Sequence, residues 1–557
     1  MTSTLRKRTP IPLIRTGVPG LDTVLGGGLP QYSFNLIAGG PGAGKTTLAQ
    51  QILFSRARVE RPALYFTVLG EPALKMLRHA QQYSFFDPAK FNSAVRFVNL
   101  SAEAIEQDLG KLFERISGEI QSIQPDLVVV DSFPTIIRAG TSEAQVQEFV
   151  QRLALLLTGW EATTFLVGEY SRTESYNPIF TVADGILWLI QTVERNASVR
   201  QLQIAKSRAS SPMLGLHTFV ISGDGIRVFP RVLPRTAASL RRANERASTG
   251  VPGLDGMMHG GIPAGETIMV VGPSGAGKST LARHFIASGA AAREGGVIAV
   301  FEEHPGEYLA RADVFGPQLR AAIDRKQVEI LSLRPFELSV DETLADVREA
   351  IERTEAKRLV VDSISGFELA LAPMFRYDFR ETLFRMISAL AGSGVTTLMT
   401  VSLVESYIEF GLSPYITEFL ADSLLLLRYV ELEGRLEKVL AVVKMRSSDH
   451  DLGVYSYTIG DSGVTIGGSV RGYRGVLTGL PLLSALNAET RPGLTDIEAA
   501  VLRQIGASGD VSATELSRLC GMKSSAMALA LERLQRLGYA ARTRRRGGVA
   551  TYQEKKR

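Results

Sequence analysis

Gly39-Gly-Pro-Gly-Ala-Gly-Lys-Thr46 follows the pattern G-x-x-x-x-G-K-[ST], and Gly272-Pro-Ser-Gly-Ala-Gly-Lys-Ser279 follows it again. Each copy stands after an apolar run typical of a strand and before a run typical of a helix. In such a loop, backbone N–H groups surround an anion, and the N-terminus of the following helix adds partial positive charge. The sequence therefore predicts two phosphate-binding loops. A glycine-rich turn that only reverses the chain is the weaker interpretation, because both copies share the same context.

Both loops carry the groups that ATP and Mg²⁺ require. We expect the two lysines at the β- and γ-phosphates and the hydroxyl that follows each lysine at the metal. An aspartate ends an apolar strand in each half of the chain, at Asp131 and Asp362. The expected Mg²⁺ ligands are Thr46, Asp131, Ser279 and Asp362. The expected ATP-binding residues are these four together with Gly39, Gly40, Pro41, Gly42, Ala43, Gly44, Lys45, Thr47, Gly272, Pro273, Ser274, Gly275, Ala276, Gly277, Lys278 and Thr280.

A long internal repeat surrounds the loops. The segment Thr16-Gly-Val-Pro-Gly-Leu-Asp22 returns as Thr249-Gly-Val-Pro-Gly-Leu-Asp255, and Lys278 follows Lys45 by the same 233 residues. A repeat of this length indicates a duplicated domain and not a solenoid unit. Apolar strand-like runs alternate with amphipathic helical runs in both copies, which is typical of a mostly parallel sheet covered by helices. Antiparallel strands are expected to close the first copy.

Composition fits a globular protein. The chain has 557 residues, 45% hydrophobic and 21% charged, and a single cysteine, Cys520, so no intrachain disulfide is possible. No apolar run approaches the roughly 18 residues that a membrane-spanning helix needs. We therefore expect a cytoplasmic protein. The net charge of +5 is concentrated in the last 67 residues, where lysine and arginine outnumber acidic residues by seven.

The fold class predicted for the chain is α/β, with two tandem P-loop domains and a small third domain. The expected boundaries are a flexible basic arm at 1–13, domain one at 14–232, a linker at 233–246, domain two at 247–471, a linker at 472–492 and the third domain at 493–557. The first linker carries several arginines, and a solvated connector is favoured over a nucleic-acid contact.

Hydrolysis also needs a group that orients water. Glu302 and Glu303 end the strand that follows the second phosphate loop, so one carboxylate can accept a hydrogen bond from the attacking water. A solvated acidic pair is the alternative. The first repeat has no such pair, and its Glu71 comes later. We therefore expect the first site to bind ATP and to hydrolyse it slowly or not at all.

Together, the paired segments, both phosphate loops, the Phe-Glu-Glu and Val-Asp-Ser strand ends and Lys444-Met-Arg-Ser-Ser-Asp-His450 resemble the KaiC family of tandem RecA-like ATPases. The resemblance covers about residues 14–468. It implies two stacked hexameric rings with ATP between subunits, where a late K-x-R…H segment reaches the neighbour's phosphates. The residues that match this segment are Lys444, Arg446 and His450 in the second repeat and Lys206 and Arg208 in the first. Ordinary strand-end cations are the alternative, and Pro212 stands where the first repeat would carry the histidine.

The chain departs from the family at the phosphorylation site. The family's clock protein phosphorylates an adjacent Ser-Thr pair before the aspartate that opens a late strand. Aligned on Asp422, that pair falls on Glu418 and Phe419, and Thr417 is only a weak substitute. Autokinase activity is therefore disfavoured at the usual pair. Our hypothesis is that Glu418 provides a permanent, phosphate-like charge.

The last 60 or so residues resemble a winged helix-turn-helix domain. Helices are expected over Thr495–Ala507, from a capping box at Ser512–Glu515 to Cys520, and from Lys523 or Ser524 to Gly538. The third helix would present Met527 and other early residues to a DNA groove, and a basic hairpin would contact phosphates. Protein docking is the alternative. The DNA-contacting residues expected are Lys523, Ser524, Ser525, Arg542, Arg544, Arg545 and Arg546.

These expectations favour a hexameric signalling ATPase that uses ATP and Mg²⁺, hydrolyses ATP mainly in domain two and retains at most residual autokinase activity. Its expected partners are copies of itself and either double-stranded DNA or a signalling protein, with no membrane. One alternative is a DNA-binding regulator in which ATP only assembles the ring. Another is a RecA-like recombinase, which the tandem repeat and the absence of an evident single-strand-binding loop disfavour.

Overall fold

A computed structural model gives the fold of the chain. It describes residues 11–555 except for 69–72, 102–107, 137–141, 173–176, 195–196, 232–244, 302–303, 313–316, 334–338, 372–374, 376–378, 392, 404–420, 447, 472, 479–481, 484–493, 510 and 545–549. The chain divides into two compact units, residues 1–469 and 470–557. The first unit contains two nine-stranded sheets, and the second contains a three-stranded sheet.

The first sheet has the strand order β11-β10-β9-β8-β3-β7-β6-β4-β5. Its strands from β8 to β5 run parallel, and β9 to β11 add antiparallel strands at the other edge. The strands are β3 (Phe34–Gly39), β4 (Ala63–Thr67), β5 (Val95–Asn99), β6 (Leu127–Asp131), β7 (Thr163–Gly168), β8 (Gly185–Glu194), β9 (Ala197–Ser207), β10 (His217–Ser222) and β11 (Gly225–Phe229).

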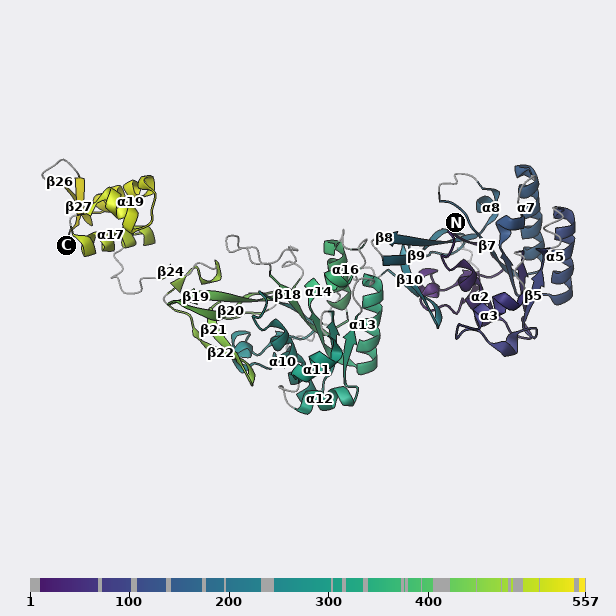
Figure 1. Ribbon diagram of the computed structural model, residues 1–557, viewed down its shortest axis with the longest axis horizontal. Coiled ribbons are helices and arrows are strands. Elements are labelled where there is room, and N and C mark those ends of the chain that lie inside the picture. Colours follow the sequence, from purple (N-terminus) through teal and green to yellow (C-terminus); the bar gives the residue numbers. More distant parts are fainter. Residues whose placement is uncertain are drawn as a thin grey trace, which may run out of the picture. The chain divides into compact units, whose positions relative to one another are not determined.

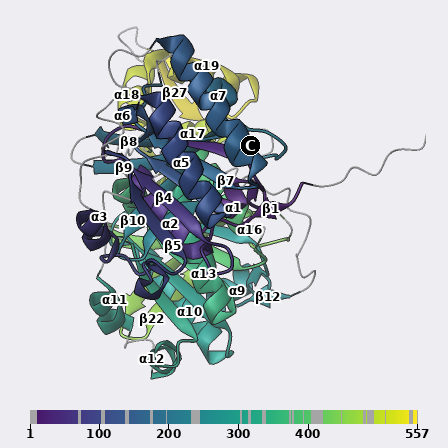
Figure 2. The same cartoon turned by 90° about the vertical axis from the view of Figure 1, so that its right-hand side faces the viewer.

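Helices cover both faces of this sheet. They are α1 (Leu21–Val24), α2 (Lys45–Arg56), α3 (Ala73–Ala80), α5 (Leu109–Ile123), α6 (Phe133–Ile136), α7 (Glu143–Gly159) and α8 (Pro178–Val182). Alternate residues of the central strands face opposite sides, so Ile37 packs with α2 whereas Leu36 packs with α5 and α7. The two long helices α5 and α7 lie side by side on one face (Figures 1 and 2). A short pair, β1 (Leu13–Ile14) and β2 (Leu29–Pro30), precedes the sheet.

The second sheet repeats the plan in the order β16-β15-β17-β18-β14-β19-β20-β21-β22. Its strands are β14 (Thr267–Gly272), β15 (Gly295–Val300), β16 (Val328–Ser332), β17 (Ala356–Asp362), β18 (Thr396–Ser402), β19 (Ser423–Leu432), β20 (Arg435–Met445), β21 (Tyr455–Gly460) and β22 (Gly463–Ser469). β12 (Arg246–Ala247) pairs with β13 (Ile262–Pro263). The helices are α9 (Pro252–Met257), α10 (Lys278–Ala291), α11 (Pro305–Ala312), α12 (Pro317–Asp324), α13 (Val340–Thr354), α14 (Ile364–Ala370) and α16 (Phe379–Ala391).

The repeated Thr…Asp segment has the same conformation in both halves. Asp22 Oδ1 accepts hydrogen bonds from the backbone N–H and the hydroxyl of Thr16, at 2.7 and 2.8 Å. Asp255 Oδ1 accepts the same two bonds from Thr249, both at 2.7 Å. Since the carboxylate closes the turn on both a backbone and a side-chain donor, the spacing of the two residues is fixed. We call this pair of hydrogen bonds the Thr…Asp staple, and it fixes the turn at the start of each domain.

The second unit has the winged-helix order of elements. They are α17 (Asp496–Ser508), β25 (Val511–Ser512), α18 (Ala513–Leu519), α19 (Ser524–Arg536), β26 (Ala540–Arg544) and β27 (Ala550–Glu554), preceded by β23 (Tyr473–Arg474) and β24 (Leu482–Leu483). The three helices pack on the sheet β25-β27-β26 around a core that includes Leu516 and Leu531 (Figure 1). Ser512 caps α18 as expected by accepting a bond from the N–H of Glu515. The α/β class, the two RecA-like domains and the winged helix predicted from the sequence are confirmed.

Candidate nucleotide sites

The first phosphate loop connects β3 to α2. Helix α2 begins at Lys45, and its N-cap, Gly44, has φ of 95°. The positive φ at Gly44 favours glycine, and a Cβ there would also lie 2.7 Å from Ile221 Cδ1. Lys45 is 8% exposed, and its ammonium donates to the carbonyl oxygen of Gly40 at 2.7 Å. The loop therefore curls around the lysine at the N-terminus of a helix, as a phosphate site requires.

The metal-site candidates of the first domain are in contact. Asp131 ends β6, and its Oδ2 accepts hydrogen bonds from Thr46 Oγ1 at 2.7 Å and from the Tyr65 hydroxyl at 2.6 Å. Burial raises the pKa of Asp131, although both hydrogen bonds and Lys45 act in the opposite direction. A carboxylate beside a hydroxyl offers the hard oxygen ligands that Mg²⁺ prefers. The donor set fits the ion.

A carboxylate faces the lysine of this first site. Glu169 follows β7, and its Oε1 lies 3.8 Å from Lys45 Nζ. Burial lowers the pKa of Lys45, and Glu169 partly opposes that effect. The lysine thus already has an anionic neighbour, with which a bound phosphate would have to compete.

The second phosphate loop has the same form with different surroundings. Lys278 begins α10 and donates to the carbonyl oxygens of Gly272 and Pro273, both at 2.9 Å, and Gly277 has φ of 93°. Asp362 ends β17 and accepts a hydrogen bond from Thr400 Oγ1 at 2.5 Å. The peptide bonds after Asp131 and Asp362 are both cis.

Strand register shows where the two sites differ. Thr67 pairs with Asp131 and Val300 with Asp362, so Ile298 occupies the place of Tyr65. The 233-residue offset also puts Ser402 in the place of Glu169. No sequence motif marks Tyr65 or Glu169 as a site residue, although an alignment of the two halves at the 233-residue offset reveals both differences.

The expected catalytic carboxylates lie beyond the end of β15. Phe301 N donates to the carbonyl of Asp362, as Val68 N does to that of Asp131, which makes Phe301 and Val68 equivalent. Glu302 and Glu303 are the next two residues, whereas Glu71 comes third after Val68. Glu302, Glu303 and Glu71 lie outside the described residues. Their roles remain proposals from the sequence.

Lys206 lies on β9 and Lys444 on β20, and Arg208 and Arg446 are the first residues after these strands. Lys206 Nζ donates to the carbonyls of Phe180 and Thr181 at 2.9 and 3.1 Å, and Arg208 lies 3.2 Å from Asp184 Oδ1. Burial and the neighbouring Arg208 lower the pKa of Lys206. Lys444 Nζ donates to the carbonyl of Ala421 at 2.8 Å. The two segments share one backbone anchor, because Arg208 N donates to the carbonyl of Asp184 as Arg446 N does to that of Asp422.

The K-x-R cations lie at the opposite end of the parallel strands from the phosphate loops. Lys206 pairs with Ile186, near the start of β8, whereas the loop leaves β3 at Gly39, level with Leu189. Three to four residues at about 3.3 Å each separate the two levels by about 10–13 Å. Arg446 N bonds to the carbonyl of Asp422, beside Thr267 at the start of β14. The arrangement separates each K-x-R segment from the loop of its own domain.

His450 follows the second K-x-R segment. Its backbone N–H donates to Asp449 Oδ1 at 2.9 Å. Its Nε2 is buried and has no hydrogen-bond partner among the described residues. Thr417, Glu418 and Phe419 lie outside those residues.

The candidate DNA face of the second unit is partly described. Lys523 is the N-cap of α19 and is exposed together with Ser524 and Ser525, and Arg542 is exposed on β26. The placement of Met527 at this face is wrong, because Met527 is fully buried. Its spacing to Leu531 and Leu534 puts all three on the core face of the helix. The Arg544 side chain, Arg545 and Arg546 lie outside the described residues.

Comparisons with known proteins agree with this architecture. The family model "ATPase: KaiC" matches residues 14–232 and 247–470, and the MarR-family model matches residues 493–548. The circadian clock oscillator protein KaiC of Parathermosynechococcus lividus is 26% identical over 501 residues, covering 87% of this chain and 91% of that protein. KaiC 1 of Synechocystis is 27% identical over 482 residues, covering 84% and 91%. The resemblances inferred from the motifs are confirmed. No helix among the described residues has the length and apolarity needed to cross a membrane.

Proposed function

The chain belongs to the KaiC family of ATPases, and on that basis we propose that it is a hexameric signalling ATPase that hydrolyses ATP mainly in its second domain. Family membership supports ATP binding and ATPase activity. The observation that supports the assignment best is the duplicated loop itself. Two buried lysines stand at helix N-termini, each beside a strand that ends in an aspartate.

In the proposed mechanism, the loop N–H groups and Lys278 bind the phosphates, and Ser279 and Asp362 hold the metal. Bound Mg²⁺ would neutralise charge that develops on the β- and γ-phosphates. Glu302 or Glu303 would accept a hydrogen bond from the attacking water, and Lys444, Arg446 and His450 would act on the site of a neighbouring subunit. A fixed cation at that position stabilises charge in the transition state.

The K-x-R segments lie at the opposite end of the strands from the phosphate loops, and this position supports action between subunits. A K-x-R cation lies about 10 Å or more along the strands from the phosphate loop of its own domain. It therefore reaches a phosphate only if another copy of the chain presents its loop there. A head-to-tail arrangement of this kind closes into a ring when the rotation per subunit permits. The hexamer is the closed form that the family resemblance implies.

We propose that the first site mainly assembles the ring. Three features of that site support a reduced activity. The Tyr65 hydroxyl is hydrogen-bonded to Asp131, and Glu169 lies beside Lys45. Leu69 and Gly70 stand where the second domain has Glu302 and Glu303. Residual autokinase activity remains an expectation from the family, and Thr417 is the weak candidate near the usual pair.

ATP turnover and particle mass, measured together, test this division. We expect Lys278→Ala to remove turnover and leave the hexamer intact, and Lys45→Ala to dissociate the hexamer. Glu302→Gln with Glu303→Gln should abolish hydrolysis and preserve assembly. If neither lysine variant changes turnover or mass, the proposal is wrong.

A second candidate function is supported by the MarR-family match of residues 493–548 and by the exposed Lys523, Ser524, Ser525 and Arg542. In this alternative the chain is a DNA-binding regulator, and ATP only assembles the ring. Sequence-selective DNA binding that needs ATP binding but not hydrolysis would favour it. ATP-driven strand exchange would instead favour a RecA-like recombinase.

A further inference from the structure

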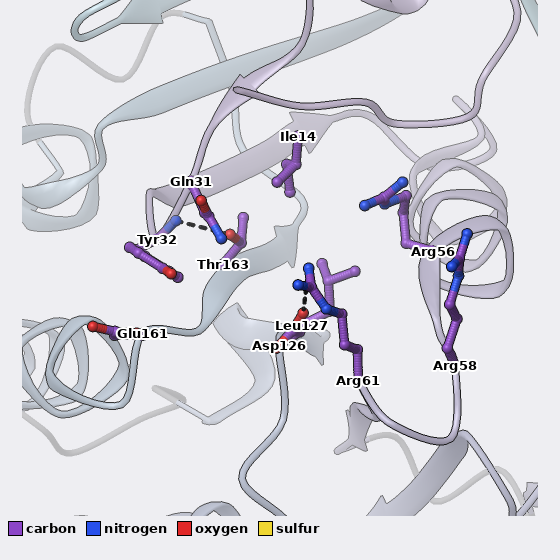
Figure 3. A pocket seen from close by; sticks show the side chains of 10 residues that line it. All are labelled: Ile14, Gln31, Tyr32, Arg56, Arg58, Arg61, Asp126, Leu127, Glu161 and Thr163. Atoms are coloured by element: carbon purple, nitrogen blue, oxygen red, sulfur yellow. Dashed lines mark hydrogen bonds and ion pairs between the residues drawn. The ribbon is translucent and has the colours of Figure 1, made fainter. Parts of the chain in front are cut away.

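A pocket of about 130 Å³ lies in the first domain, at the opposite end of the parallel strands from the phosphate loop (Figure 3). Its floor includes Leu127, the first residue of β6, and Thr163, the first residue of β7. Asp131 ends β6 four residues after Leu127, so the pocket and the metal-site aspartate are about 13 Å apart along the strand. The pocket is therefore separate from the nucleotide site of its own domain.

One wall of the pocket is formed by Arg56, Arg58 and Arg61. Arg56 ends α2, and Arg58 and Arg61 exchange two backbone hydrogen bonds, at 3.1 and 3.0 Å, across a two-residue turn. Residues paired in this way project their side chains to the same face. The turn thus places Arg58 and Arg61 on one side of the pocket, and the end of α2 adds Arg56.

The charge of this wall is only partly balanced. Arg61 pairs with Asp126 at 3.5 Å, and both side chains are about half exposed, so the pair is weak and exchangeable. No side-chain partner of Arg56 or Arg58 is found among the described residues. The lining of the pocket as a whole holds three arginines and two carboxylates, Asp126 and Glu161, so it keeps a net positive charge that attracts an anion.

The opposite wall is fixed and polar. Tyr32 N donates to Thr163 Oγ1 at 2.9 Å, which positions the buried hydroxyl of Thr163. Thr163 N donates to the carbonyl of Asp126, and Asp126 N donates to that of Pro62 at 2.9 Å. These bonds connect the wall to the arginine turn. Gln31 adds a side-chain amide, and Figure 3 shows it across the pocket from the arginines. Glu161 lies beyond Tyr32, at the outer rim of that wall (Figure 3).

We propose that this pocket binds a single phosphate group. Guanidinium groups match phosphate oxygens in charge and in the geometry of their N–H donors. Ile14 and Leu127 offer an apolar surface, and Tyr32 a half-exposed ring, to whatever carries the phosphate.

Calorimetric titration of the full-length chain, with both phosphate loops saturated by a non-hydrolysable ATP analogue and Mg²⁺, tests the proposal. Inorganic phosphate should bind at one further site per chain. Arg56→Gln with Arg58→Gln should weaken that binding by about tenfold or more, since each charged hydrogen bond contributes substantially. Arg78→Gln with Arg293→Gln removes the same charge from exposed positions elsewhere and should leave the affinity unchanged.

Two further ligands identify the source of the phosphate group. Tighter binding of AMP than of inorganic phosphate would indicate a nucleotide, and tighter binding of O-phosphoserine would indicate a phosphorylated side chain. The analogue's affinity and the unfolding temperature should not change in the Arg56/Arg58 variant, because these side chains are at the surface. The proposal is overturned if none of the three ligands binds to the saturated wild-type chain, or if the variant binds them as tightly as wild type does.

Discussion

Arg446→Ala provides a direct test of action between subunits. Arg446 stands beside the start of β14, and the phosphate loop leaves that strand at Gly272. Five residues at about 3.3 Å each place these levels about 17 Å apart, beyond the reach of one arginine side chain. Arg446 should therefore contribute nothing to the site of its own chain.

The expected size of the effect follows from this geometry. Loss of one preorganised cation at a transition-state charge should lower turnover by about 10²–10³-fold. Lys278→Ala should lower it at least as much, because it removes the phosphate-binding lysine. If subunits of the two variants mix at random in equal amounts, about one quarter of the interfaces combine an intact loop with an intact Arg446. The mixture should then recover about one quarter of wild-type turnover.

The assay is steady-state phosphate release from the mixed rings, with the mass of each sample measured in parallel. Arg435→Ala is the matched control, since Arg435 is exposed at the other end of the same strand and should leave turnover unchanged. Glu302→Gln with Glu303→Gln can replace Lys278→Ala if the lysine variant fails to assemble. If the mixture is no more active than the two variants alone, the cation acts within its own chain or not at all.

Three further changes have expected outcomes. Tyr65→Phe should destabilise the first domain by about 1.5–3 kcal/mol, because a buried hydroxyl-to-carboxylate bond is lost, whereas Tyr83→Phe should change its denaturation midpoint little. His217 accepts a hydrogen bond from the backbone N–H of Arg231, and burial lowers the pKa of His217 from its usual value of 6.5. The unfolded state therefore takes up a proton at a higher pH than the folded state does, so the stability of domain one should fall as the pH drops below 6.5. The fall should be less steep in His217→Gln. Arg544→Ala with Arg545→Ala should reduce salt-dependent DNA binding, and unchanged binding in a filter or anisotropy assay would contradict the wing assignment.

The fold could be predicted well because its main determinants are local. The loop pattern, the strand periodicity and the Thr…Asp staple each lie within a short stretch, and α18 begins at the expected cap, Ser512. The expected placement of Met527 at the DNA face is wrong because the residue lies in the core of the third domain, although its position near the start of the helix favours a DNA contact. Helical periodicity at that position already pointed to the core.

The details of the sites were harder to predict, because they depend on pairing between distant strands. Tyr65 lies in an apolar strand that reads as core, and only the register with β6 brings its hydroxyl to Asp131. The phosphate pocket combines a helix end, a turn and the first residues of two strands, which no local pattern brings together. Long-range register is thus the information that the sequence did not supply.

The differences between the two nucleotide sites are concentrated at the groups that act on ATP. The staples at Thr16 and Thr249 are retained, as are both loop lysines, so both domains keep the groups that are expected to bind phosphate. Three replaced positions lie at groups with different roles. The first domain has Tyr65 beside the metal aspartate where the second has Ile298, and Glu169 beside the lysine where the second has Ser402. It also has Leu69 and Gly70 where the second has the paired glutamates. Each of these replacements lies at a group that is expected to act on ATP, so together they support the proposal that the first domain binds nucleotide and the second hydrolyses it.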